Sequence, residues 1–127
     1  MTVTVTCKAQ LFLISQPKQE IKNWIDTANN YHIVRDNVLT HDDKLPVFIE
    51  LKSKSKSDQF IRFYFDSNDT CRVYRVMADA KFSVTYIKQL NDNYQKIGDN
   101  QWINKSNEFQ IYTYIMDGIF IMDYSKI

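Results

Sequence analysis

The segment IYTYIMDGIFIMDY, at residues 111–124, constrains the fold of this chain more than any other. Two runs rich in aromatic and β-branched residues flank Asp117 and Gly118, and Asp-Gly is a strong signal for a two-residue type I′ turn. Such a turn places Met116 opposite Ile119, which sets the register of both strands. The other expected pairs are Ile115 with Phe120, Tyr114 with Ile121, Thr113 with Met122, and Tyr112 with Asp123.

In this register both faces of the hairpin are apolar, although an antiparallel hairpin at the surface normally has one polar face. One face holds Ile111, Ile115, Phe120, Met122 and Tyr124. The opposite face is our candidate protein interface, and it holds Tyr112, Tyr114, Met116, Ile119 and Ile121. It needs a cover, because monomers seldom leave an apolar patch of roughly several hundred Å² bare.

Two kinds of cover remain open from the sequence. The hairpin can be central in the sheet, with helices on one side and a loop or the 31–40 segment on the other. Alternatively, a second copy of the chain or another protein covers the candidate interface, since Tyr and Met are enriched in such contacts. Two helices of about 12 to 15 residues can cover one face of a sheet but hardly both, which is the reason to expect a second chain.

The rest of the chain contains strand and helix patterns. Alternating apolar and polar residues predict strands at residues 2–14, 47–52, 59–66, 70–77, 108–116 and 119–124. Apolar residues three and four apart predict one helix after Ser15, a suitable N-cap, and another at 82–96. The 31–40 segment fits a strand or a helical turn, and we expect a strand.

The resulting element order is β-α-β-β-β-β-α-β-β. Because hairpins dominate, we predict an α+β fold, with a mainly antiparallel sheet of five to seven strands and two helices packed on one face. The chain has 127 residues and no linker or repeat, so we expect a single domain over residues 1–127.

Charge and composition exclude several classes of protein. The formal net charge is +1, so no overall field draws the chain to nucleic acid or to anionic lipid. No run approaches the ~18 apolar residues of a membrane span, and the N-terminus lacks the pattern of a signal peptide. We therefore expect a cytoplasmic protein without membrane contact. Cys7 and Cys71 form no disulfide framework or zinc motif, and we expect buried free thiols.

The sequence contains no signature of an enzyme. It has two glycines in all, which rules out a glycine-rich phosphate loop, and no nucleophile motif occurs. The weak exception is His41 with Asp42 and Asp43, but consecutive loop residues cannot easily converge on one metal ion. We expect no catalytic residues, no cofactor and no bound metal.

A second candidate surface lies on the central strands. Phe60, Arg62 and Tyr64 share one face if Ile61, Phe63, Phe65, Cys71 and Val73 point to the core. Mixed cations and aromatic rings can stack the bases of single strands and contact phosphates, although packing of Arg on Tyr is also common on a solvated sheet. The candidate nucleic-acid face comprises Lys52, Lys54, Lys56, Arg62, Tyr64, Arg72 and Tyr74.

These patterns rank three functions. The first is a small non-enzymatic protein-interaction protein, of the accessory, inhibitor or immunity type, expected to self-associate as a homodimer. The alternative is a module that binds single-stranded nucleic acid through the Arg and Tyr face. The third is an enzyme whose site the sequence does not reveal.

Overall fold

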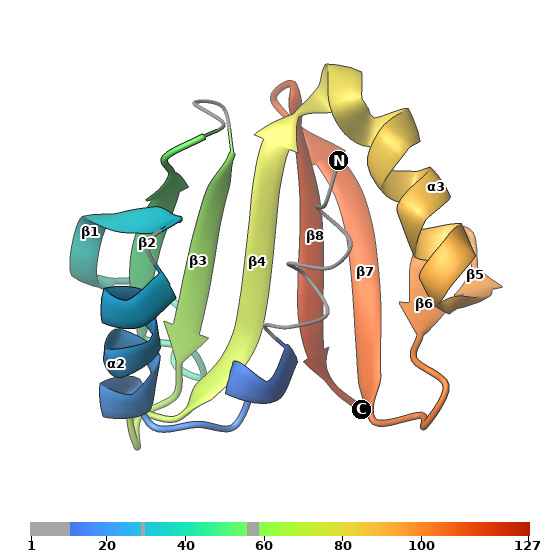
Figure 1. The fold of residues 1–127 in the computed structure, drawn as a ribbon. Helices are drawn as coiled ribbons and strands as arrows, with labels where there is room; N and C mark the ends of the chain where they lie inside the picture. The colour runs from blue at the N-terminus through green and yellow to red at the C-terminus, as the bar shows by residue number, and fades with distance from the viewer. Residues whose placement is uncertain (1–10, 29, 56–58) are drawn as a thin grey trace.

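A computed structural model describes residues 11–28, 30–55 and 59–127 of the chain. The fold is α+β, with one antiparallel sheet of eight strands and, in the described residues, two α-helices (Figure 1). The strands are β1 (Tyr31–Leu39), β2 (Val47–Ser53), β3 (Phe60–Phe65), β4 (Cys71–Asp79), β5 (Gln95–Gly98), β6 (Gln101–Ile103), β7 (Phe109–Met116) and β8 (Ile119–Lys126). The helices are α2 (Lys18–Ala28) and α3 (Ser83–Asn93), and the short 3-10 helices are η1 (Leu11–Leu13) and η2 (Ala80–Phe82).

The sheet consists of two meanders joined in the middle. Its strand order is β1-β2-β3-β4-β8-β7-β6-β5, and every neighbouring pair is antiparallel. The join is the pairing of β4 with β8, which makes these two the central strands. The hairpin of β7 and β8 therefore sits inside the sheet, and the two edges are β1 and β5.

The helices and the core lie on one side of the sheet, which we call the helix face (Figure 1). Trp24 of α2 packs edge-on against Phe63, with ring centroids 6.1 Å apart, and Tyr86 of α3 stacks on Phe120 at 5.9 Å. Between these contacts Tyr74 continues the row of buried rings, 5.2 Å from Phe63. Burial of this aromatic and aliphatic surface supplies most of the favourable free energy of folding.

The structure confirms the predicted hairpin and its register. All of the expected pairs occur, from Met116 with Ile119 to Tyr112 with Asp123. Asp117 and Gly118 have φ values of 53° and 78°, the positive pair that a type I′ turn requires. The strand expected in the 31–40 segment is also confirmed, as β1.

The number and order of strands were predicted incorrectly. The sheet has eight strands, not five to seven, because the segment after α3 forms β5 and β6 where we expected a connector. Helix α3 ends at Asn93, before the expected end at residue 96, and the next residue, Tyr94, is already extended. The chain thus has enough residues to return as a short hairpin before β7.

The N-terminal predictions are corrected in part. Residues 2–10 of the strand expected at 2–14 lie outside the described residues, and Leu11–Leu13 of its last part form the 3-10 helix η1. Ser15 is not a helix cap, because α2 begins at Lys18. Instead, Ser15 has a φ of 81° and its backbone N–H donates to the Cys71 carbonyl at 2.7 Å, which ties this segment to the start of β4. No helix of the described ranges is both long enough and apolar enough to span a membrane.

Candidate protein-binding face

The side of the sheet opposite the helix face, which we call the open face, is where the candidate site lies. The strand registers place the following side chains from β2, β3, β4, β8 and β7 on it: Phe48, Glu50, Lys52, Phe60, Arg62, Tyr64, Val73, Arg75, Met77, Asp79, Ile119, Ile121, Asp123, Ser125, Gln110, Tyr112, Tyr114 and Met116. Both described helices pack against the other side, so neither of them covers this face.

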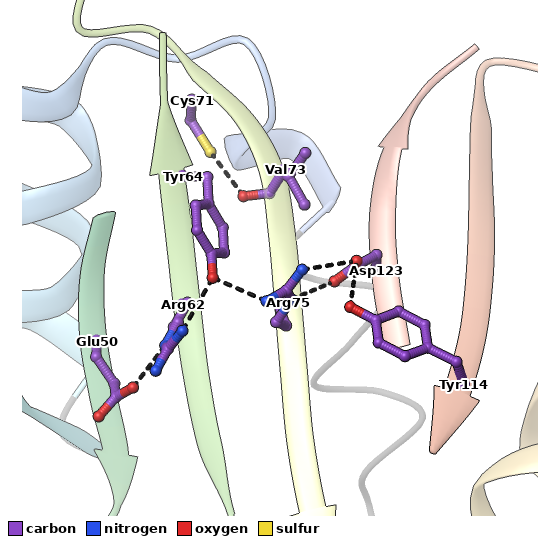
Figure 2. Close-up of polar contacts among 8 residues, drawn as sticks. All are labelled: Glu50, Arg62, Tyr64, Cys71, Val73, Arg75, Tyr114 and Asp123. Atoms are coloured by element: carbon purple, nitrogen blue, oxygen red, sulfur yellow. Dashed lines mark hydrogen bonds and ion pairs between the residues drawn. The ribbon is translucent and has the colours of Figure 1, made fainter. Parts of the chain in front are cut away.

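A row of polar side chains crosses the open face, and we call it the polar ladder: Glu50, Arg62, Tyr64, Arg75, Asp123 and Tyr114 (Figure 2). At one end, Arg62 Nε donates to Glu50 Oε1 at 2.6 Å. Its Nη1 donates to the Tyr64 hydroxyl oxygen at 3.0 Å. The Arg62 guanidinium also lies over the Phe48 ring, 4.3 Å from its centroid. These contacts hold the cation flat against the sheet.

The second arginine of the polar ladder is held in the same way. Arg75 forms a two-point ion pair with Asp123, with Nε to Oδ1 at 2.7 Å and Nη2 to Oδ2 at 3.1 Å. Its Nη1 donates to the same Tyr64 hydroxyl at 2.9 Å, so this oxygen accepts from both arginines. Tyr114 donates to Asp123 Oδ2 at 3.4 Å and closes the ladder (Figure 2).

The polar ladder is electrostatically balanced. Arg62 and Arg75 lie opposite each other on β3 and β4, which alone would be unfavourable, but a carboxylate flanks each of them. Burial opposes the charge of Arg75, yet its hydrogen bonds to Asp123 prevail and its pKa is raised. Burial, and then the nearby charge of Asp123, raise the pKa of Tyr114. The ladder therefore carries two positive and two negative charges, and Tyr114 stays protonated at neutral pH.

Next to the polar ladder the open face becomes apolar. Of the five residues of the candidate protein interface, Tyr112, Met116 and Ile119 are 44%, 56% and 39% exposed. Tyr114 is half-buried, and Ile121 is 6% exposed in a row between Met77 and Tyr114. The structure thus keeps all five side chains on one face. Tyr112, Met116 and Ile119 are accessible to a partner, whereas Tyr114 and Ile121 are largely packed within the monomer.

The exposed apolar surface continues around the turn of the β7–β8 hairpin, a feature that the sequence patterns did not reveal. The Ala80 N–H donates to the Gly118 carbonyl at 2.9 Å, which fastens η2 to this turn. Phe82 and Val84, just beyond, are 39% and 78% exposed, and Ile115 of β7 is 59% exposed although its strand position belongs to the helix face. The sequence pattern had placed Ile115 on the hairpin face opposite the candidate interface, and it gave no sign that this side chain is exposed.

The residues of the candidate nucleic-acid face do not all lie on one side of the sheet. Tyr74 is fully buried on the helix face, 5.4 Å from Tyr124 between ring centroids, and Val73 takes the position on the open face. The reason is a bulge: Phe65 pairs with Cys71 and Tyr64 with Val73, so one residue of β4 has no partner and the later residues change faces.

The expected cations are likewise separated. Arg72 occupies the bulge and its Nε donates to Asp66 Oδ2 at 2.8 Å, away from Arg62. Lys52 does lie on the open face, with its ammonium 5.7 Å from the centre of the Phe60 ring, and Lys54 is exposed in the loop after β2. Lys56 lies outside the described residues. Arg62, Tyr64 and Lys52 therefore share a face, and Arg72 and Tyr74 do not join them.

The loop between β1 and β2 borders the polar ladder. Asp42 and Leu45 of this loop, together with Tyr64, Arg75 and Asp123, line a cavity of about 130 Å³. Pockets for drug-sized ligands are about 300–1,000 Å³, so this one is too small for such a molecule. His41 and Asp43 are exposed in the same loop, and within the described part of the chain no three His, Cys, Asp or Glu side chains gather as a metal site would require.

Cys71 lies in the core at the start of β4 and is fully buried. Its thiol donates to the Val73 carbonyl at a sulfur–oxygen distance of 3.8 Å, and burial raises its pKa to about 12 (Figure 2). Since the thiolate is the reactive form, we predict that Cys71 in a Cys7→Ser variant resists alkylation near pH 8 until urea unfolds the protein. Mass spectrometry of the alkylated protein checks this, and rapid labelling of the folded chain would contradict the burial.

Comparisons with known proteins gave no relative for this chain: no family model, no curated protein and no solved structure matched it. No activity or partner is therefore carried over from another protein. The fold and the open face together define the class, an α+β protein with a single sheet whose side opposite the two described helices carries a balanced polar ladder beside an apolar surface.

Proposed function

We propose that this protein is a non-enzymatic protein-interaction domain and that it binds its partner through the open face. The observation that carries the proposal is the composition of this face, because half of its side chains are Tyr, Phe, Met or Arg. These are the residue types enriched at protein interfaces, whereas Lys, Glu and Asp are depleted there. A solvated sheet face has the opposite composition.

The polar ladder supports a protein partner over a nucleic acid. Binding to nucleic acid relies on cations that neutralise phosphates, but each arginine of the ladder is already engaged by a carboxylate. A protein can instead cover a balanced set of ion pairs without leaving any charge unpaired, which avoids the largest penalty of burying charges. The ladder would then act in orientation and specificity more than in affinity.

An accessory, inhibitor or immunity-type role is the form of this function that we propose. Such a role needs a rigid surface and no reactive group. Tyr112 and Met116 are the exposed large side chains that can enter a pocket on a partner, as hot-spot residues do. The half-buried ladder beside them supplies hydrogen-bonding groups that are already fixed in place.

Site-specific photo-crosslinking tests the proposal in the cells that produce the protein. A photoreactive amino acid at position 112 should give discrete protein adducts, because Tyr112 is 44% exposed on the open face. The matched control carries the same group at Lys88, an exposed position of α3 on the other side of the sheet. Equal yields from both positions, or no protein adduct from position 112, would refute the proposal, and adducts removed by nuclease would favour the nucleic-acid alternative.

A further inference from the structure

We infer that the partner of the open face is a second copy of this chain, packed sheet against sheet about a two-fold axis. The inference rests on the proposed function, because it names the partner of the same face. Three features of the molecule support it: the two sheet edges, the charge balance of the face, and its area.

The edges of the sheet are poor sites for association. Edge strand β1 has register shifts between Ile33 and Arg35 and again between Arg35 and Val38, and Asn37 has a φ of 50°. Bulges of this kind, together with a charged side chain such as Arg35, hinder another strand from pairing with the edge. The other edge, β5, has four residues, too few for extended pairing. A second copy is thus directed to the face of the sheet and away from its edges.

The charge of the open face suits contact with itself. A two-fold axis places the same patch on both sides of the interface, so a patch with a net charge would repel its own copy. The polar ladder has two positive and two negative groups, all in ion pairs, and the other charged side chains of the face are Lys52 and Asp79, one of each sign. The accessible part beside it, Tyr112, Met116 and Ile119, carries no charge. Nothing in this region opposes self-association, and a strongly charged partner would find no complementary field.

The area of the face is close to what a stable dimer needs. The five strands β2, β3, β4, β8 and β7 are adjacent in the sheet. At about 4.8 Å between strands and 3.3 Å per residue, they span roughly 24 Å by 23 Å. Two such faces in contact bury on the order of 1,100 Å², before the relief of the side chains is counted, and stable interfaces begin near 1,200 Å². Sheets stacked in this way lie about 10 Å apart.

The β7–β8 half of the face forms the centre of this contact. Tyr112 and Met116 lie on the outer strand of the pair and Ile119 on the inner one, with the buried Ile121 beneath them. Because Ile121 is part of the monomer's packing, a substitution there would damage the fold as well as the contact. Tyr112 and Met116 are therefore the positions at which dimerisation can be changed without disturbing the monomer.

Sedimentation equilibrium of the purified full chain tests the inference. Wild type should have twice the monomer mass of 15.1 kDa at tens of micromolar. Tyr112→Glu and Met116→Lys should each raise the dimer dissociation constant by about thirtyfold or more, as hot-spot losses do. The matched control is Val34→Glu on edge strand β1, since Val34 is 41% exposed and Tyr112 is 44% exposed. It should leave the dimer unchanged, and circular dichroism should show folded protein in every case.

The outcomes separate this inference from the proposed function. A wild type that remains at 15.1 kDa overturns the dimer, whatever the variants do. If position 112 still crosslinks a different protein, the proposed function stands without it. A dimer that Val34→Glu dissociates and Tyr112→Glu does not would be an edge-to-edge dimer, and it would also overturn the inference. If Tyr112→Glu is insoluble, the milder Tyr112→Ser and Met116→Gln must weaken the dimer in its place.

Discussion

Replacing Trp102 with alanine should lower the free energy of unfolding by about 3–5 kcal/mol, the usual loss for a buried aromatic side chain. Trp102 is fully buried in β6 and belongs to the core cluster. Its indole N–H donates to Asn91 Oδ1 of α3 at 2.9 Å, so this one side chain fastens the helix to the outer strands. Proteins of ordinary stability have about 5–15 kcal/mol in all, so the variant should unfold at much lower urea concentration.

Two controls separate the packing of Trp102 from its hydrogen bond and from the general effect of losing a ring. Asn91→Ala removes the acceptor alone and should cost about 1–3 kcal/mol, the penalty for an unpaired buried donor. Phe82→Ala removes a ring that is 39% exposed and should cost clearly less than Trp102→Ala. Urea unfolding followed by circular dichroism measures all three. A loss below about 1 kcal/mol for Trp102→Ala would contradict the cavity that its removal must leave.

Replacing Asp123 with alanine should destabilise the protein by about 2 kcal/mol, because it leaves the Arg75 guanidinium without its partner. The side chains of this pair are 23% and 21% exposed, so the loss should be smaller than for a fully buried pair. The double variant Arg75→Met/Asp123→Leu should recover most of the stability, since it leaves no charge unpaired. The measurement is urea unfolding of Asp123→Ala and of the double variant, each at the same low protein concentration.

The hairpin between β3 and β4 offers a matched control for the polar ladder. Arg72 and Asp66 form a similar ion pair, with Nε and Oδ2 2.8 Å apart, but the Arg72 side chain is 51% exposed. Arg72→Ala should change stability much less than Asp123→Ala does, because the Asp66 carboxylate that remains still accepts from the Asn68 and Thr70 backbone N–H groups. If the two pairs prove equally sensitive, the polar ladder has no special role in the stability of the open face.

Local chemistry made part of this fold predictable. The Asp117-Gly118 turn sets the register of its hairpin within a few residues, and every expected pair is present. The period of apolar residues likewise indicated both helices. These features depend on residues that are close together in the sequence, so the sequence alone is enough to predict them.

The sites on the central strands were not predictable in the same way. Alternation placed Tyr74 beside Arg62 and Tyr64, but a bulge at Arg72 moved Tyr74 into the core and Val73 out of it. A one-residue slip reverses every later side chain of a strand, and no local signal reports it. The same slip brought Arg75, not Arg72, into the candidate site.

The sequence by itself determined the hairpin, its register and the two-sided apolar pattern, because a two-residue turn and strict alternation are short-range constraints. The tertiary structure alone decided which of the apolar side chains are bare, since burial depends on where α3 and η2 meet the sheet. It also alone assembled the polar ladder, whose six residues come from five strands between positions 50 and 123. Contacts over such separations arise from the order of strands in the sheet, and that order is a property of the whole packed chain.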